Sequence, residues 1–191
     1  PALGGSLEIS GEAKEIRNPR AAISVGIALA PEDRKQHGLV LPMSVRENSS
    51  LPSLQRDASR GWLNENAERA VTQNAVKSMK IKTPNFEQMA RFLSGGNQQK
   101  IVLGKTLETN PEILIVIEPT RGVDVGAKMD IYKMLEKLCK EGVAIVLVST
   151  DVPEILSISH RVLVVSTGKI RKEFSKGEAN QQELLYEASL N

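Results

Sequence analysis

Two short segments of the chain carry residues suited to phosphate chemistry. Residues 93–100 read Leu-Ser-Gly-Gly-Asn-Gln-Gln-Lys. At the start of a helix, Ser-Gly-Gly presents unpaired N–H groups and a hydroxyl to an anion, and the helix dipole also favours negative charge there. Glu118 directly follows the apolar run 113–117, and ligands of α/β sheets bind at the carboxyl ends of such strands. Together the two segments indicate part of a nucleotide site.

The usual phosphate-cradling pattern, Gly-x-x-x-x-Gly-Lys followed by Ser or Thr, does not occur in the sequence. Gly104-Lys105-Thr106 comes close, but Gln99 stands where the first Gly is required and the intervening residues read as helix. Residues 122–128 are one residue short and lack a hydroxyl after the Lys. The sequence therefore predicts an incomplete nucleotide site.

The composition indicates a globular domain. The 191 residues are 40% hydrophobic and 25% charged, with a net charge of +2, which are values of a folded domain with a sizeable core. Basic and acidic residues are interleaved and aromatic residues make up only 3%, which argues against a nucleic-acid-binding surface. Apolar runs are no longer than strands, so the sequence predicts no membrane-spanning segment.

The elements that would position the two segments begin with a helix capped by Asn18 and a strand at 27–30. Residues 44–60, rich in Ser, Asn and Pro, predict a surface connection. A helix is predicted from Asn64, and another runs from the Ser-Gly-Gly loop to about residue 109. The apolar face of the first of these two helices comprises Ala67, Ala70, Val71, Ala75 and Met79.

The carboxyl-terminal half alternates strands and helices. Residues 113–117 and 143–148 predict strands, the second of the kind that is covered on both faces in a parallel sheet. Asp124 predicts the cap of the helix between them. The core stripe of that helix is assigned to Ile131, Met134, Leu135, Leu138 and Cys139. With a further strand at 161–165 and a terminal helix at 181–190, this order predicts an α/β fold with a mostly parallel sheet.

Three motifs resemble the ATP-binding-cassette ATPases, and most closely the second, C-terminal cassette of bacterial monosaccharide importers of the ribose, xylose and galactose type. The motifs are Pro31-Glu32-Asp33-Arg34-Lys35, the octet at 93–100, and Glu118-Pro119-Thr120-Arg121-Gly122-Val123-Asp124-Val125-Gly126-Ala127-Lys128. The octet matches the signature loop, residues 113–118 match the Walker B strand, and residues 122–124 match the D-loop. The resemblance covers nearly the whole chain.

This resemblance implies a partial P-loop NTPase fold, truncated before the Walker A loop that would precede Pro1. It divides the chain into the first part of the cassette core up to the Q-loop region (1–43), a helical subdomain with the signature loop (44–100), and an α/β core with Walker B, D-loop and switch region (101–191).

The family pattern also implies roles for single residues. ATP held by a partner cassette would be bound by Ser94, Gly95 and Gly96, together with Asn97 and Gln98. A side chain at either glycine would block the approach of the backbone to the γ-phosphate. Glu118 would be the catalytic base that orients water. The remaining nucleotide-binding candidates are Asp124, Glu32 and Thr150.

Three positions depart from the common cassette pattern. Ile117 stands at the position of the Asp that helps to hold Mg²⁺, and its side chain offers no oxygen ligand, so no metal-ligating residue is expected here. Thr150 stands at the switch His position, and Glu32 stands where many cassettes have a Gln. ATP and Mg²⁺ are therefore expected cofactors of the complete transporter, and the chain alone is expected to be inactive as an ATPase.

The partners implied are a second nucleotide-binding cassette, an integral-membrane sugar permease and, indirectly, a sugar-binding protein, without nucleic acid. The implied location is peripheral, on the cytoplasmic face of a bacterial inner membrane. Two alternatives remain open at this point. One is a non-catalytic regulatory or structural cassette, because Ile117 weakens the site. The other is a DNA-repair or translation-factor ATPase that shares the signature loop.

Overall fold

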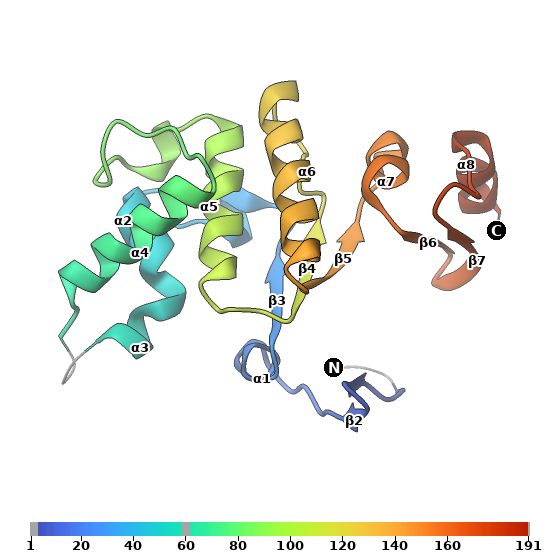
Figure 1. The fold of residues 1–191 in the computed structure, drawn as a ribbon, viewed down its shortest axis with the longest axis horizontal. Coiled ribbons are helices and arrows are strands. Elements are labelled where there is room, and N and C mark those ends of the chain that lie inside the picture. The colour runs from blue at the N-terminus through green and yellow to red at the C-terminus, as the bar shows by residue number, and fades with distance from the viewer. Residues whose placement is uncertain (1–3, 59–61, 191) are drawn as a thin grey trace.

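The computed structural model describes residues 4–58 and 62–190. At its centre is a three-stranded parallel sheet in the order β3-β4-β5 (Figure 1). The strands are β3 (Ile27–Ala30), β4 (Ile113–Ile117) and β5 (Ala144–Val148). Ile27 pairs with Ile113, and Ile113 pairs with Ala144. Because the strands are parallel, all three end at the same edge, where their following loops meet.

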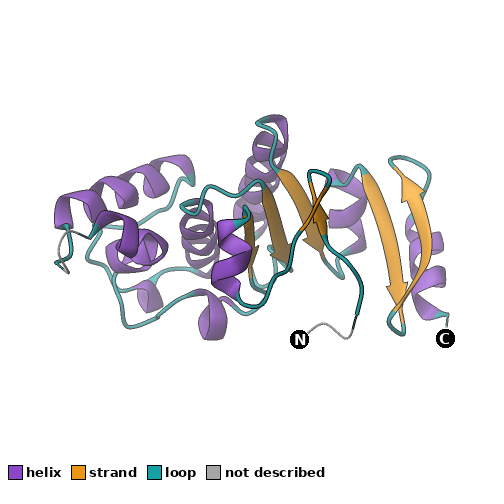
Figure 2. Ribbon diagram, turned by 90° about the horizontal axis from the view of Figure 1, so that it is seen from below, coloured by secondary structure: helices purple, strands orange, loops and turns teal. Residues whose placement is uncertain are grey.

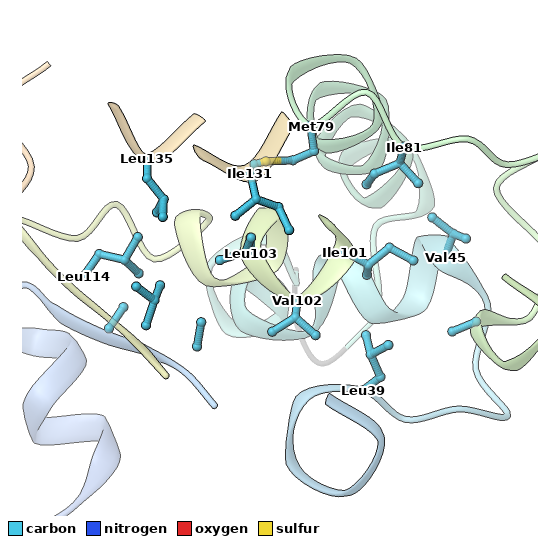
Figure 3. Close-up of a cluster of buried hydrophobic side chains, with 14 residues drawn as sticks. Leu39, Val45, Met79, Ile81, Ile101, Val102, Leu103, Leu114, Ile131 and Leu135 are labelled. Atoms are coloured by element: carbon cyan, nitrogen blue, oxygen red, sulfur yellow. The ribbon is translucent and has the colours of Figure 1, made fainter. Parts of the chain in front are cut away.

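One face of this sheet forms the main core. It is covered by α5 (Gly95–Leu107) and α6 (Val125–Lys140), and Figure 3 shows Leu114 of β4 lying among Leu103, Ile131 and Leu135 of these helices. Leu114 and Val116 are fully buried, with 0% exposure. Their alternation in β4 places both side chains on the helix-covered face.

The opposite face of the sheet is open within the described residues. Leu29, Val146 and Val148 are each about half exposed, at 52%, 49% and 48%. The prediction that the strand at 143–148 is covered on both faces is therefore wrong, because no described element packs against these alternate side chains. Apolar residues on an uncovered sheet face raise the risk of association with other molecules.

A helical segment between β3 and β4 contains α2 (Val45–Ser50), α3 (Leu54–Asp57) and α4 (Glu65–Ser78), with short 3-10 helices at Leu51–Ser53 and Ala90–Phe92. The predicted surface connection at 44–60 is wrong where it is described: α2 packs against α4 and α5. Two of its buried polar side chains find partners within the chain. The Asn48 amide donates to the carbonyls of Val40 and Ser44, and the Ser50 hydroxyl donates to Glu68 Oε1 at 2.7 Å.

Two core assignments within helices are also corrected. Cys139 is exposed, whereas its neighbour Leu138 in the same turn of α6 packs against the core. Ala70 of α4 is exposed, whereas Val71 and Ala75 are buried. In α4 the buried face also includes the polar residues Glu68 and Thr72, so it is shifted from the apolar stripe in the sequence.

The two ends of the described chain lie away from the parallel sheet (Figures 1 and 2). Before β3 come a small hairpin, β1 (Glu8–Ile9) and β2 (Glu12–Ala13), and α1 (Pro19–Ser24), which Asn18 caps as predicted. After β5 come α7 (Val152–Ile158), an antiparallel hairpin of β6 (Arg161–Ser166) and β7 (Lys169–Ser175), and α8 (Gln181–Ser189). None of the described helices combines the length and the apolar character needed to cross a membrane.

Candidate functional site

An open cleft of about 530 Å³ lies at the carboxyl ends of the parallel strands. It is lined by Glu32, Glu118, Thr120, Arg121, Gly122, Thr150 and Asp151. Three of the predicted site residues, Glu32, Glu118 and Thr150, therefore meet in one place although they follow three different strands. The cleft is the part of the described structure where ligand chemistry is expected for this sheet topology.

Glu118 is held in position by the backbone around it. Its φ of +47° lies in the left-handed region, a conformation that costs a non-glycine residue roughly 1–3 kcal/mol and is concentrated at functional sites. Its N–H donates to the Val148 carbonyl at 2.8 Å. Its Oε1 accepts the N–H of Thr150 at 2.7 Å. The sharp turn after β4 thus aims the carboxylate across the end of β5.

Glu32 is paired with Arg121 across the cleft. Both side chains are about half exposed or more, at 47% and 68%, so the pair contributes little to stability but partly neutralises the acidic lining. Arg121 belongs to the motif at 118–128, but the sequence indicated no role for it. Its position beside Glu32 is visible only when the loops after β3 and β4 come together.

The signature octet spans the start of α5. Ser94 is the N-cap, and its Oγ accepts from the N–H of Asn97 at 3.4 Å and from Asn97 Nδ2 at 3.0 Å. Asn97 Oδ1 accepts the N–H of Lys82 at 2.8 Å, and Gln98 Nε2 donates to the Ala90 carbonyl at 3.0 Å. Ser94 itself is exposed. Asn97 and Gln98 therefore brace the loop, and Ser94 is the member that faces outward.

Gly95 and Gly96 are required by contacts within the chain. A Cβ at Gly95 would lie 2.7 Å from Arg34 Nη2 and 2.8 Å from the Gly122 carbonyl oxygen. A Cβ at Gly96 would lie 2.7 Å from the Ala127 Cβ. The sequence indicated that a side chain here would obstruct an external phosphate. The structure adds a second reason for glycine at these positions, because the start of α5 packs directly on the turn after β4.

Asp124 caps α6, with its Oδ1 accepting the N–H of Ala127 at 2.9 Å. This agrees with the cap predicted from the sequence. Asp124 also lies beside Gly96, whose added Cβ would be 3.4 Å from Asp124 Oδ2. The turn that matches a D-loop and the loop that matches a signature loop are therefore direct neighbours.

The roles of two residues of this region were not predicted from the sequence. Arg34 Nη1 donates to the Arg121 carbonyl at 2.7 Å. Glu154 of α7 is only 1% exposed and accepts from Thr120 Oγ1 at 2.9 Å and from Ser149 Oγ at 2.6 Å. In the sequence Glu154 reads as an ordinary acidic residue of a first helical turn, so nothing there distinguished it.

The start of α7 is linked to α6 by an ion pair between Lys128 and Asp151. The hydrogen bond from the Lys128 ammonium lowers the pKa of the Asp151 carboxyl, and the N–H of Glu154 adds to this effect. The same bond to Asp151 raises the pKa of Lys128. The pair keeps both groups charged at neutral pH, and Asp151 lines the cleft beside Thr150.

The residues present do not fit a magnesium site. Ile117 is half-buried in the last register position of β4, opposite Val148, and an alkyl side chain cannot supply the oxygen ligand that Mg²⁺ requires. No group of three or more His, Cys, Asp or Glu side chains suited to a metal occurs among residues 4–58 and 62–190. No metal-dependent step is therefore derived for this chain.

Comparison with known proteins gives a consistent picture. No protein-family model matches the chain. It is 49% identical over 181 residues to the xylose import ATP-binding protein of Moorella thermoacetica, and 42% identical over 184 residues to the ribose import ATP-binding protein of Rhodopirellula baltica. These alignments cover 95% and 96% of the chain but only 36% of each relative. The chain thus spans about a third of the length of the curated relatives that it matches.

Among solved structures, a dimeric ATP-binding cassette bound to ADP and phosphate superposes with a TM-score of 0.76 at 20% identity. The match covers 91% of the chain and 74% of that cassette, and at this identity it shows a shared fold. The chain therefore has the α/β fold of an ATP-binding cassette and is homologous to part of the ATP-binding proteins of bacterial sugar importers.

Proposed function

We propose that the chain is the signature-loop and Walker B part of the second cassette in the ATP-binding subunit of a monosaccharide importer. In this function its main contribution is to present Ser94 and the start of α5 to ATP held by a partner cassette. It also couples closure of the two cassettes to an integral-membrane sugar permease, which a sugar-binding protein supplies. The subunit would lie on the cytoplasmic face of the bacterial inner membrane.

The observation that carries this proposal is the geometry of the octet. Ser94 is exposed at the start of a 13-residue helix, whereas Asn97 and Gln98 are occupied with bracing contacts. An exposed hydroxyl and the first N–H groups of a helix form a ready anion-binding end. We propose three divisions of the chain, 1–43, 44–100 and 101–191. In this division the start of α5 lies where the helical subdomain adjoins the sheet.

Glu118 is proposed as the catalytic base of this cassette's own site, with Glu32, Thr150 and Asp124 around it. The arrangement of Glu118 and Thr150 supports such a role, since the carboxylate is fixed by an N–H donor. Ile117 weakens the same site. This favours the second candidate, a regulatory cassette that does not hydrolyse ATP at its own site. Such a cassette would still contribute its signature loop to hydrolysis at the partner's site.

The test uses Ser94 in a complete two-cassette importer that carries this segment. Asp and Asn cap helices about as well as Ser, so Ser94→Asp and Ser94→Asn both preserve the start of α5. A carboxylate about 4 Å from a γ-phosphate charge is opposed by roughly 4 kcal/mol at an effective dielectric of 20. Ser94→Asp should therefore slow hydrolysis at the opposite cassette's site by at least about a hundredfold, whereas Ser94→Asn should be mild.

Site-resolved nucleotide trapping separates the two sites of the importer. Equal hydrolysis at the opposite site for the Asp and Asn variants would show that the octet does not face a phosphate, and the proposal would fail. Salt-sensitive binding of nucleic acid by the chain would instead favour a DNA-repair or translation-factor ATPase.

A further inference from the structure

Arg34 connects three segments that are distant in sequence. It begins the π-helical turn Arg34–Gly38 after β3. Its Nη1 donates to the Arg121 carbonyl at 2.7 Å, and its Nη2 donates to the Gly122 carbonyl at 3.3 Å. Its Nε reaches Gln98 Oε1 at 3.4 Å. One guanidinium therefore touches the turn after β4 and the first turn of α5.

The position of Arg34 is fixed from its own side of the contact. Asp33 caps the π-helical turn, with Oδ1 accepting the N–H groups of Lys35 at 2.8 Å and Gln36 at 3.0 Å. The other end of the turn is pressed against α5, since a Cβ at Gly38 would lie 2.8 Å from Val102 Cγ2. The guanidinium is thus presented by a rigid turn and not by a free loop.

The opposite side of the contact is shaped to receive the guanidinium. Gly95 leaves the space that Nη2 occupies, because an added Cβ would be 2.7 Å away. The planar fork of Arg can donate to two neighbouring carbonyls at once, which a Lys ammonium on a flexible stem does not reproduce. Within the described part of the chain, the hydrogen bonds of Arg34 go to carbonyl and amide oxygens and none goes to a carboxylate.

A reciprocal contact strengthens this link. The carbonyl of Arg121 accepts from Arg34, while the side chain of Arg121 pairs with Glu32. The loops after β3 and β4 therefore hold each other at two points. A displacement of the loop that carries Glu32 pulls on the same backbone turn that contacts Gly95.

We propose that Arg34 is a positioning residue that makes the loop at Glu32, the turn at Gly122 and the signature loop move as one unit. It does not touch nucleotide in this role. It sets where Ser94 and the start of α5 lie relative to the cleft, and it transmits displacements of the Glu32 loop to them. The inference rests on the proposed function for its effect on hydrolysis, but the positioning itself is testable without nucleotide.

The experiment compares Arg34→Ala, Arg34→Lys and the control Lys35→Ala in a complete two-cassette importer that carries this segment. Lys35 is an exposed cation one position along the same turn. Hydrogen exchange is measured without nucleotide in peptides covering residues 94–100 and 119–125. These contain amides with internal acceptors, including Gln98 to the Ser94 carbonyl and Val123 to the Thr120 carbonyl.

The Ala variant should raise exchange at least about tenfold in both peptides, since it removes a shared support. Lys should not rescue it, because the role depends on the fork and not on the charge. At the opposite cassette's site, kcat should fall about tenfold to a hundredfold, as expected for misplaced catalytic groups. KM for ATP should change less than about twofold, since Arg34 does not touch nucleotide and its loss leaves ground-state binding of ATP unaffected.

Unchanged exchange in Arg34→Ala, or full rescue by Lys, would overturn the positioning role. Raised exchange in the control Lys35→Ala would overturn it as well, since the effect would then belong to the turn in general. Raised exchange in Arg34→Ala with normal opposite-site hydrolysis would support the positioning role and contradict the proposal that the loop is lent across a dimer. The two failures are therefore distinguishable.

Discussion

Removal of the Glu154 carboxylate should destabilise the cassette more than any single exposed substitution. Glu154 is buried and accepts from two hydroxyls, Thr120 Oγ1 at 2.9 Å and Ser149 Oγ at 2.6 Å. These hydroxyls belong to the segments that follow β4 and β5. Glu154→Ala leaves both hydroxyls without this acceptor. It also opens a cavity beside α7, where the buried side chain of Glu154 was.

The expected magnitude follows from these contacts. Hydrogen bonds to a charged group contribute about 1.5–3 kcal/mol each, and Glu154 accepts two of them. We expect Glu154→Ala to lower the free energy of unfolding by about 3–5 kcal/mol. Thr120→Val should lower it by about 1–3 kcal/mol. The exposed Glu136, which pairs with Lys140 on the surface of α6, serves as control. Glu136→Ala should change the free energy of unfolding by less than about 1 kcal/mol.

The assay is urea unfolding of a cassette containing these residues, followed by circular dichroism. If Glu154 holds Thr120, the double variant should be less destabilised than the sum of the single variants, by about 1–2 kcal/mol. Strict additivity of the two substitutions would refute the reasoning, because it would mean that the carboxylate and the hydroxyl act independently. An effect of Glu154→Ala no larger than that of Glu136→Ala would refute it as well.

Three other outcomes are expected. In a complete importer, Ile117→Asp should increase Mg²⁺-dependent hydrolysis at this cassette's own site, because it adds an oxygen ligand at the end of β4; no increase in site-resolved trapping would contradict this. Residues 1–191 alone should show no ATPase activity above background, and turnover that Glu118→Gln abolishes would reveal an unrecognised phosphate site. The lowered pKa of Asp151 stabilises the fold above the ordinary Asp pKa near 3.8, and this stabilisation is lost as pH falls through the lower folded value. Lys128→Met should therefore be more destabilising at neutral pH than at a pH below the lowered pKa of Asp151, as measured by urea unfolding across that range.

Sequence patterns predicted this fold best where one residue determines the local backbone. Asn18 and Asp124 each cap a helix by accepting an N–H three residues later, and each was identified from residue type and spacing alone. The strands at 27–30 and 113–117 were likewise predicted, because short apolar runs between turn residues leave few alternatives. These signals are local, because the cap and the strand each depend on interactions between residues that are close in the sequence.

The helical segment shows why composition misled. Ser and Asn usually favour loops because they compete for backbone hydrogen bonds. In α2 the same residues are buried because their partners lie elsewhere: Ser50 donates to Glu68, and the Arg46 guanidinium pairs with Glu68 at 2.7 Å. Such satisfaction depends on α4 being adjacent, and nothing within residues 44–60 specifies that neighbour.

The candidate site divides in the same way. The motif residues Glu32, Glu118 and Thr150 were named from the sequence, and the structure brings them to one cleft. Arg34 and Glu154 were missed because their partners are distant along the chain, as in the contact between Arg34 and the Gly122 carbonyl. A residue type is enough to predict a chemical group at the site. The residues that hold this group in place are identified only from the three-dimensional structure.

The pairing of β3 with β4 has a consequence for how the chain folds. Residues 31–112 lie between these two paired strands, so the sheet closes a very long loop. The entropy of closure grows with loop length, and contacts between distant residues form slowly. We expect the helices of the intervening segment to form first and shorten the loop, and β3 and β4 to pair last. Pulse-labelling hydrogen exchange should then protect the amides of α4 and α5 before those of β4.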